Sequence, residues 1–429
     1  MRILLAGLEH LRPKDPRISL GVASIAANLA RVGADFAVES VNVASENGSE
    51  PDLAPLLARA LSPDFNHKGA CLMLGAFVWN EPYIQHVLQV LEREKFAGKV
   101  AIGGPQVTYA DKGTLEGHYP RADMFIRGYA EHAVAGLWAG ELAVPGVHYR
   151  GRRDAGMQAW ASLDTLPSPH LEGWLPVGDF VRWETQRGCP YTCRFCQHRQ
   201  PIFPDGSRVA RAGEDRVADE IALFCASNAT AELAVLDPTF NTDTDRAVHV
   251  LDQLKANGFA GRLELQVRPE RLTNRFLDAI ERLGAEHVVL ELGIQSTNVS
   301  ELFAIERSRG TDPAALQTKV ASKLGKVRER NMQAEVSLIF GLPGQTVASF
   351  AQSIADCRAM LPEAKLVAFP LMLLRGTQLH ADRARLGLVE GTVDHPLTGR
   401  IQQFIPHVVE SPTMTRADWT TMADMAAAL

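Results

Sequence analysis

Short apolar runs alternate with amphipathic stretches through the first third of the chain. The apolar runs have the length of strands and cover residues 2–7, 35–43, 70–78, 99–105 and 122–128. Between the first two, residues 19–33 place Val22, Ile25 and Leu29 on one helical face, with Ser19 as the N-cap. Strands that alternate with helices predict a Rossmann-like, doubly wound parallel sheet over residues 1–145. Ligands of such sheets bind at the carboxyl ends of the strands.

The alternation stops and then resumes with a second set of elements. Residues 146–178 are rich in proline, glycine and tryptophan, and we interpret them as a linker. Further strands are predicted at 180–186, 232–237, 262–268, 287–293, 334–340 and 365–373. Six βα units without a Rossmann-type glycine fingerprint predict a partial (β/α)6 barrel of the TIM type over residues 179–375, with its chemistry at the C-terminal strand ends. Residues 376–429 form a short C-terminal extension.

The composition narrows the possible partners. The 44 basic residues are scattered among 50 acidic ones and the net charge is −6, so the balance of charge does not favour a nucleic acid as partner. We see no apolar run long enough to span a bilayer and expect no membrane association. We therefore expect a cytoplasmic protein, whose reducing surroundings make a disulfide framework of the six cysteines improbable.

Three of the six cysteines crowd into the stretch QRGCPYTCRFCQH, residues 186–198. Cys189, Cys193 and Cys196 lie just past the first barrel strand, on the rim where barrel chemistry gathers. Thiolates are soft ligands, and three of them at these spacings suit three corners of a compact iron–sulfur cube. One iron would then remain open to another ligand. The alternative is a Cys3His zinc site completed by His198. We interpret Cys71, Cys225 and Cys357 as small core hydrophobes.

The pattern Cys-x3-Cys-x-aromatic-Cys, with Phe195 as the aromatic residue, resembles the radical S-adenosylmethionine (SAM) superfamily. The resemblance implies that the three cysteines hold a 4Fe-4S cluster and that SAM binds the open iron. The reduced cluster then passes one electron to SAM, and a carbon–sulfur bond of SAM breaks. It also implies an external reductant such as a flavodoxin or ferredoxin.

Later strand ends resemble the segments with which this superfamily binds SAM. In LDPTFNTD the polar candidates are Asp237, Thr239 and Asn241; in LELQVRPERL they are Gln266 and Arg268; in LELGIQSTN they are Glu291, Gln295 and Ser296. LIFGLPGQT places Gly341 in a turn near the adenine, with Gln345 where the family usually has an acid. The alternative role for each of these residues is an ordinary strand-end hydrogen bond or turn.

The first domain resembles the cobalamin-binding domain of the largest radical SAM subclass. AIGGPQVT, with Gly103 and Gly104, resembles its Gly-Gly-Pro turn, and RGYAEHAV its Gly-Glu-Gly-Glu stretch. The chain lacks the Asp-x-His-x-x-Gly motif that carries the lower axial histidine of many cobalamin proteins. Many members of this subclass lack the motif and still bind cobalamin, so the resemblance of the fold makes cobalamin an expected cofactor alongside the 4Fe-4S cluster and SAM.

The resemblance implies a radical SAM transferase. We favour cobalamin-dependent methyl transfer in natural-product biosynthesis. The short C-terminal extension leaves little surface for a large acceptor, which favours a small-molecule acceptor whichever group is transferred. The alternative reaction is cobalamin-independent transfer of the 3-amino-3-carboxypropyl group of SAM to arsenite, as in the radical SAM enzymes of arsinothricin biosynthesis. Outside catalysis, the chain could be a zinc-stabilised scaffold or a cobalamin-sensing module.

Overall fold

The computed structural model describes residues 1–11, 14–15, 18–43, 51–199, 203–226, 230–307, 312–398 and 405–429. The chain divides into two units. Unit 1 comprises Met1–Pro176 with Phe203–Asp205, and unit 2 comprises Val177–Ile202 with Gly206–Leu429. Among the described residues, no helix is long and apolar enough to cross a membrane.

Unit 1 is a doubly wound α/β sheet. Its elements are β1 (Arg2–Glu9), α1 (Leu20–Arg31), β2 (Phe36–Asn42), α2 (Ala54–Leu61), β3 (Ala70–Gly75), α3 (Glu81–Arg93), β4 (Lys99–Gly103), α4 (Pro105–Thr108), α5 (Leu115–His118), β5 (Met124–Ile126), α6 (Glu131–Ala139) and β6 (Val147–Tyr149). The strand order is β2-β1-β3-β4-β5-β6, with β6 antiparallel to β5 and the other neighbours parallel. The strand order reverses between β1 and β3, which is where such sheets bind ligands.

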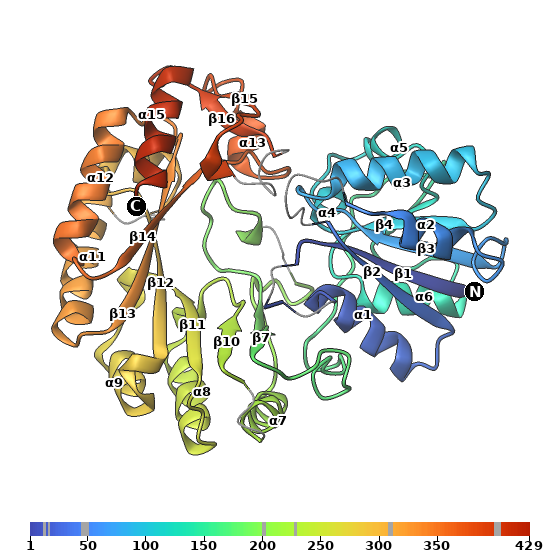
Figure 1. Cartoon of the computed structure of the whole chain (residues 1–429), viewed down its shortest axis with the longest axis horizontal. Coiled ribbons are helices and arrows are strands. Elements are labelled where there is room, and N and C mark those ends of the chain that lie inside the picture. The colour runs from blue at the N-terminus through green and yellow to red at the C-terminus, as the bar shows by residue number, and fades with distance from the viewer. Residues whose placement is uncertain are drawn as a thin grey trace. The chain divides into compact units, whose positions relative to one another are not determined.

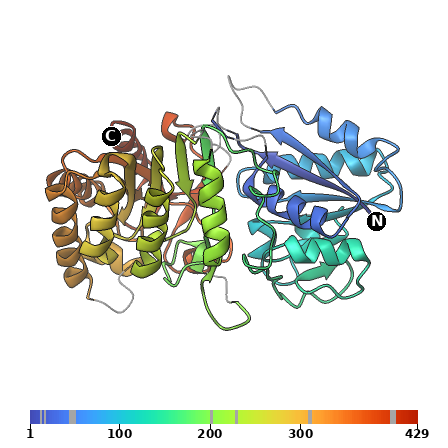
Figure 2. The same ribbon diagram turned by 90° about the horizontal axis from the view of Figure 1, so that it is seen from below.

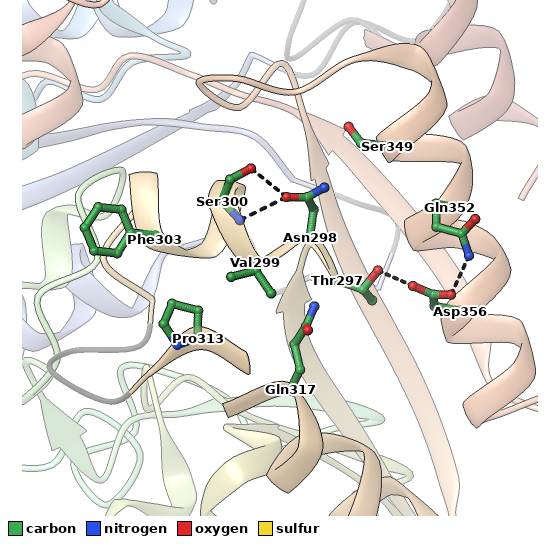
Figure 3. A pocket seen from close by; sticks show the side chains of 10 residues that line it. All are labelled: Thr297, Asn298, Val299, Ser300, Phe303, Pro313, Gln317, Ser349, Gln352 and Asp356. Carbon is green, nitrogen blue, oxygen red and sulfur yellow. Dashed lines mark hydrogen bonds between the residues drawn. The ribbon is translucent and has the colours of Figure 1, made fainter. Parts of the chain in front are cut away.

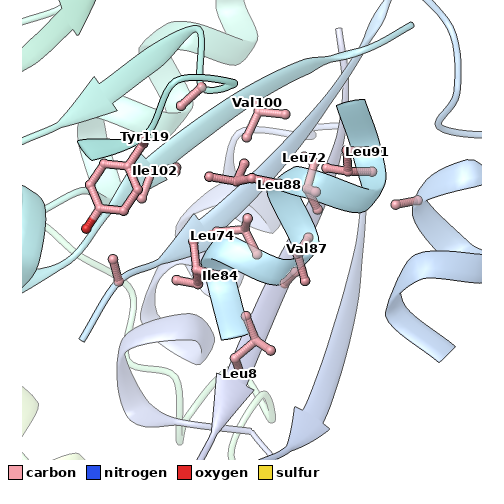
Figure 4. Packing of buried hydrophobic residues seen from close by; sticks show 14 of the residues in the cluster. Leu8, Leu72, Leu74, Ile84, Val87, Leu88, Leu91, Val100, Ile102 and Tyr119 are labelled. Atoms are coloured by element: carbon pink, nitrogen blue, oxygen red, sulfur yellow. The ribbon is translucent and has the colours of Figure 1, made fainter. Parts of the chain in front are cut away.

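Helices cover both faces of the unit 1 sheet (Figure 1). On one face, Leu72 and Leu74 of β3 pack against Ile84, Val87 and Leu88 of α3 (Figure 4). The alternate residues of the same strand, Cys71 and Met73, belong to a second core that includes residues of α1 and α6. A strand buried on both faces reads as a continuous apolar run, and so the sequence predicts these parallel strands well. The N-cap at Ser19 is confirmed, since its hydroxyl accepts a hydrogen bond from the Val22 amide.

Unit 2 is an open parallel barrel followed by a small C-terminal extension. Its elements are β7 (Phe180–Trp183), β8 (Gln186–Arg187), η1 (Gln197–Arg199), β9 (Ala210–Arg211), α7 (Glu214–Cys225), β10 (Glu232–Val235), η2 (Phe240–Thr242), α8 (Thr244–Ala256), β11 (Arg262–Val267), η3 (Pro269–Arg271), α9 (Asn274–Leu283), η4 (Ala285–His287), β12 (Val288–Gln295), α10 (Val299–Ala304), α11 (Pro313–Glu329), β13 (Gln333–Phe340), α12 (Val347–Met360), β14 (Lys365–Pro370), α13 (Gln378–Asp382), β15 (Val389–Gly391), η5 (Pro396–Thr398), β16 (His407–Glu410) and α15 (Arg416–Ala427). Six parallel strands run in the order β14-β13-β12-β11-β10-β7.

The helices of unit 2 lie along the outside of its curved sheet (Figure 2). In β11, Leu263, Leu265 and Val267 are buried toward these helices, whereas Glu264 and Gln266 alternate with them on the inner face. The partial barrel over six βα units is thus confirmed. Its inner face is polar, which leaves room for chemistry rather than for a packed core.

The C-terminal extension packs on the end of β13. The ring of Trp419 in α15 lies 5.4 Å from that of Phe340, and the Val408 amide donates a hydrogen bond to the Leu371 carbonyl. The hydroxyl of Thr413 donates to the carbonyl of Gln345, in the turn that follows β13. The extension therefore closes over one turn of the barrel.

The segment that we interpret as a linker begins with β6, which extends the unit 1 sheet.

The three cysteines outside the loop differ in burial. Cys71 and Cys357 are buried as expected, and burial raises the pKa of each thiol to about 12. Cys225 is only half-buried. None of these three cysteines lies in the loop that carries the other three.

Candidate functional site

The cysteine loop leaves β8 and returns at β9, which pairs antiparallel with β8. Cys189 and Cys193 are buried, and Cys196 is partly so. Arg194 fixes the middle of the loop, because its backbone amide donates to the Ile305 carbonyl and its guanidinium to the Ala304 carbonyl at 2.9 Å. The same guanidinium pairs with Asp382. The loop is thus attached to the end of α10 and to α13 in the segment that carries the thiols.

The three thiols interact electrostatically with one another. Burial raises the pKa of Cys196 to about 12, and nearby Cys193 and Cys189 add to the rise. A thiolate at this position therefore needs a cationic partner such as iron. Among the residues described, no three His, Cys, Asp or Glu side chains are arranged to hold one metal ion together. A cubane cluster does not require that arrangement, since each cysteine binds a different iron.

Two guanidinium groups face Cys193. Nη1 of Arg268 lies 3.6 Å from the sulfur and Nη1 of Arg307 lies 3.9 Å from it. Arg268 also donates to Glu270 at 2.5 Å and to the Arg307 carbonyl at 2.8 Å. Its guanidinium carbon sits 3.7 Å from the ring centroid of Tyr191, a cation–π contact. Although burial opposes it, the charges of Arg307 and Arg268 lower the pKa of Glu270.

Arg307 and Glu270 belong to this cluster of charges but were not among the predicted site residues. Arg307 stands 114 residues beyond Cys193, in a segment without a recognisable motif. Glu270 follows Arg268 by two positions, and its acidic side chain directly after a predicted strand end is a signal that was available in the sequence. Tyr191 and Phe195 lie in the loop itself, each partly buried.

Asp237 lies behind the cysteine loop rather than on the open face of the barrel. It accepts hydrogen bonds from the Thr185 amide at 2.7 Å, the Thr185 hydroxyl at 2.6 Å and the Gln186 amide at 2.9 Å. Burial raises its pKa to about 6 despite these bonds. Asp237 therefore braces β10 to the start of the loop, and its contact with SAM stays a prediction.

Thr239 and Asn241 connect neighbouring strand ends. The Thr239 hydroxyl donates to the Pro238 carbonyl and lies 3.7 Å from the sulfur of Cys189. The Asn241 amide donates to the Arg268 carbonyl at 2.9 Å and accepts from the Arg268 amide at 3.0 Å. Asn241 thus holds the backbone of the residue that reaches Cys193. Both residues are buried beside the cysteine loop.

Gln266 and Glu291 lie on the inner face of the barrel, opposite each other across β11 and β12. Burial raises the pKa of Glu291, and the charges of Glu264 and Glu335 add to the rise. Gln295 ends β12 with φ at 71°, a left-handed conformation that is strained for glutamine, next to a shift of register between Gly293 and Gln295. These three side chains are the predicted site residues that border the barrel interior.

Ser296 lies away from the barrel interior, in a buried network on the helix side. Its hydroxyl donates to Glu301 at 2.6 Å, and Glu301 also accepts from Gln345 at 2.9 Å and from Ser349 at 2.5 Å. The hydroxyl of Ser296 therefore belongs to this buried network, and its contact with SAM stays a prediction. Gly341 has φ at 85°, and a Cβ there would lie 3.2 Å from the Val408 carbonyl, so it serves the turn.

Two adjoining cavities lie on the helix side of β12. One of about 670 Å³ is lined by Thr297, Asn298 and residues of α10, α11 and α12 (Figure 3). In it Thr297 donates to Asp356, which also accepts from Gln352. The other, of about 390 Å³, has Glu270 and Arg307 in its wall. Its wall therefore includes one of the two arginines that face Cys193.

In unit 1 the expected cofactor edge is built around Asn80. Its amide donates to the Leu8 carbonyl at 3.0 Å and to the Gly75 carbonyl at 2.9 Å, which ties together β1 and β3 where the strand order reverses. Gly104 has φ at 90°, and a Cβ on it would lie 2.6 Å from the Ala76 carbonyl. A Cβ on Gly103 would meet only ordinary contacts, at 3.5 Å. Both glycines therefore lie at the expected edge, and Gly104 is also required by the fold.

A stacked aromatic pair follows β3 at the same edge. The rings of Phe77 and Trp79 lie 4.5 Å apart, with an angle of 20° between their planes. Both side chains are partly exposed. A flat apolar surface beside a glycine turn suits a large planar ligand.

Comparison with known proteins agrees with this geometry. The model of the radical SAM superfamily matches residues 183–357, which span the cysteine loop and the strands from β10 to β13. The chain is 29% identical over 315 residues to the cobalamin-dependent radical SAM methyltransferase TokK of Streptomyces tokunonensis. It is 28% identical over 315 residues to the 2-(S-pantetheinyl)-carbapenam-3-carboxylate methyltransferase of Streptantibioticus cattleyicolor. Each match covers 66% of this chain and 44% of the relative, so the chain spans less than half the length of these relatives.

A solved structure covers the whole chain. It is that of the radical SAM methyltransferase TsrM from Kitasatospora setae, with tryptophan and a SAM analogue bound. The TM-score is 0.71 at 16% sequence identity, and the match covers 100% of this chain and 89% of TsrM. At this identity the likeness concerns the fold, and it extends over both units.

Proposed function

Because the chain belongs to the radical SAM superfamily, we propose that it is a cobalamin-dependent methyltransferase that acts on a small molecule in natural-product biosynthesis. Cys189, Cys193 and Cys196 hold a 4Fe-4S cluster with one iron open to SAM. The observation that carries this proposal is the single loop on which three neighbouring thiols are presented beside two guanidinium groups. That donor set fits an iron–sulfur cluster, since thiolates are its usual ligands and the cations offset their charge.

When bound, the cluster supplies one electron for the reductive cleavage of SAM. The protein contributes position and shielding. Arg194 holds the loop to α10 and α13, and Asp237 holds its beginning to β10. Gln266, Glu291 and Gln295 border the barrel interior, where their amide and carboxyl groups suit the amino and hydroxyl groups of SAM. We assign SAM binding to these three side chains, and bracing to Asp237 and Ser296.

Methyl transfer with cobalamin is supported by the relatives and by unit 1. TokK is named a cobalamin-dependent methyltransferase, and the carbapenam enzyme is named a methyltransferase. In unit 1, the Gly103–Gly104 turn and the Phe77–Trp79 stack lie at the carboxyl edge of the sheet. This edge suits a large planar cofactor, and we assign cobalamin to it.

The cluster is tested by iron and sulfide analysis of protein reconstituted without oxygen. About four irons and four sulfides per chain are expected. Cys189→Ala, Cys193→Ala and Cys196→Ala each lose the cluster, whereas Cys225→Ala retains it because that thiol lies outside the loop. Protein that binds only zinc through these cysteines would contradict the proposal and favour a scaffold.

The reaction is tested by product analysis after incubation with SAM and a strong reductant, with and without added cobalamin. Methyl transfer is expected to give S-adenosylhomocysteine, whose formation requires cobalamin as methyl acceptor, together with 5′-deoxyadenosine from the reductive cleavage of a second SAM. An absorbance band of bound cobalamin should remain after gel filtration. Formation of 5′-methylthioadenosine without cobalamin would contradict the proposal and point to aminocarboxypropyl transfer, whose acceptor arsenite is then the compound to supply.

A further inference from the structure

The three cysteine sulfurs have unequal surroundings. Cys193 faces the guanidinium groups of Arg268 and Arg307, at 3.6 and 3.9 Å. Cys189 faces the neutral hydroxyl of Thr239 at 3.7 Å. Two fixed positive charges therefore lie beside Cys193, and that of Arg307 also acts on Cys196.

The two guanidinium groups are held in place on several sides. Arg268 is bonded to Glu270 and to the Arg307 carbonyl and is stacked on Tyr191, while Asn241 binds its backbone. Arg307 donates to the Gly293 carbonyl with its other terminal nitrogen. The side chains of Arg268 and Glu270 are only 5% and 10% exposed. Charges fixed in so dry a place act far more strongly on a neighbouring sulfur than solvated charges do.

We propose that Arg268 and Arg307 raise the reduction potential of the cluster through Cys193, and that Glu270 limits the rise. The proposal rests on the cluster-binding function proposed above. Reduction takes one electron from an external one-electron donor and adds one negative charge to the cluster. Hydrogen bonds and positive charge at a thiolate sulfur favour the reduced form. The step moves one electron and no proton.

The positive arginines and the negative Glu270 act in opposite directions on the reduction potential of the cluster. The two cations favour entry of the electron from a weak donor, and Glu270 opposes them by holding one negative charge against Arg268. Arg268 and Arg307 are positioning residues in this account, because they act on the cluster through a ligand. Their effect is therefore expected in the potential of the cluster rather than in its assembly.

The test is a potentiometric titration of the reconstituted full-length protein without SAM, followed by electron paramagnetic resonance. In Arg307→Gln the ratio of reduced to oxidised cluster at a fixed solution potential should fall about tenfold, equivalent to about 59 mV for one electron. Arg268→Gln should shift it in the same direction. Glu270→Gln should shift it in the opposite direction, because a negative charge is removed. Arg307→Lys should retain most of the wild-type potential.

Arg330→Gln is the matched control, because Arg330 pairs with Asp278 and Glu281 on the surface of unit 2. The reduction potential of the cluster in this variant should equal that of the wild type. If Arg268→Gln loses iron, the opposite shifts of Arg307→Gln and Glu270→Gln decide the question. Unchanged potentials in both, with a full cluster, would overturn this inference and leave the proposed function intact. A wild-type protein that forms no cluster would instead overturn the proposed function.

Discussion

The side-chain amide of Gln345 joins three parts of the barrel. Its oxygen accepts hydrogen bonds from the amides of Gly341 and Leu342, and its nitrogen donates to the buried carboxylate of Glu301. The superfamily that the chain resembles usually has an acid at this position. An acid here would place two carboxylates against each other, so the neighbouring Glu301 accounts for the departure.

Replacement of Gln345 by glutamate should destabilise unit 2. Gln345→Glu removes the donor to Glu301 and adds a second buried charge, and we expect the free energy of unfolding to fall by about 3 kcal/mol. Urea denaturation monitored by circular dichroism measures the loss. The double variant Gln345→Glu with Glu301→Gln restores one acid and one amide, and should recover most of the stability. Equal losses in the single and double variants would show that the pairing is unimportant.

The two adjacent glycines of unit 1 should respond differently to alanine. Gly104→Ala places a Cβ against Ala76 in a left-handed conformation and should cost about 2 kcal/mol of unfolding free energy. Gly103→Ala meets no close atom and should fold normally. Weaker cobalamin binding in a stable Gly103→Ala variant, measured by spectrophotometric titration, would then report contact with the cofactor. An equal loss of stability in both variants would contradict this distinction.

At the scale of elements, alternation of apolar and polar residues predicted the parallel strands but not every side chain's direction. The strands of both sheets are buried on at least one face and therefore have clear patterns. The antiparallel strand β6 was missed because it is three residues long and lies among glycines and prolines. No sequence pattern reveals that the hydroxyl of Ser296 donates to Glu301, because the folded barrel sets the direction of that side chain.

The C-terminal extension buries an ionisable group without a hydrogen-bond partner. His407 in β16 has no exposed surface, and neither ring nitrogen has a partner among the described residues. Burial lowers its pKa from 6.5 to about 4. The neutral ring is thus the form that the folded extension accepts, and protonation in the unfolded chain draws the equilibrium toward unfolding.

Acid should therefore weaken the extension through His407. The contribution of neutral His407 to the free energy of unfolding is fully present above pH 6.5 and falls as the pH decreases toward 4. The total loss over that range is about 3 kcal/mol. His407→Phe should lack this part of the decline while it keeps the stability at pH 7. Urea denaturation of both proteins at pH 7 and pH 5 makes the comparison. Parallel declines in the two proteins would exclude His407 as the cause.

At the scale of the whole molecule, the two cofactor sites proposed above lie one in each unit. Unit 1 has its own two-sided core, and unit 2 has the cysteine loop and the barrel. The sequence separated these units because the rhythm of apolar runs breaks between them. It could not show Arg307 beside Cys193, because only the folded barrel brings together two residues that lie 114 positions apart.

If each cofactor binds its own unit, each should raise the stability of that unit alone. Cobalamin at about 100 times its dissociation constant should stabilise unit 1 by about 2.7 kcal/mol and leave the transition of the cysteine unit in place. Differential scanning calorimetry of the full chain, with and without cobalamin, resolves the two transitions. Removal of the three loop cysteines should instead affect only the second transition. A single transition that shifts as a whole would show that the units unfold together.

The attachment of the cysteine loop to Asp382 has a consequence for the synthesis of the protein. Arg194 pairs with a residue 188 positions later in the chain, and the Leu379 amide donates to the Arg194 carbonyl. A ribosome that has just translated the cysteines has not yet made the partner that steadies them. Iron delivered during elongation would meet an unsupported loop. We therefore expect the metal to be inserted only after α13, which carries Asp382, has left the ribosome.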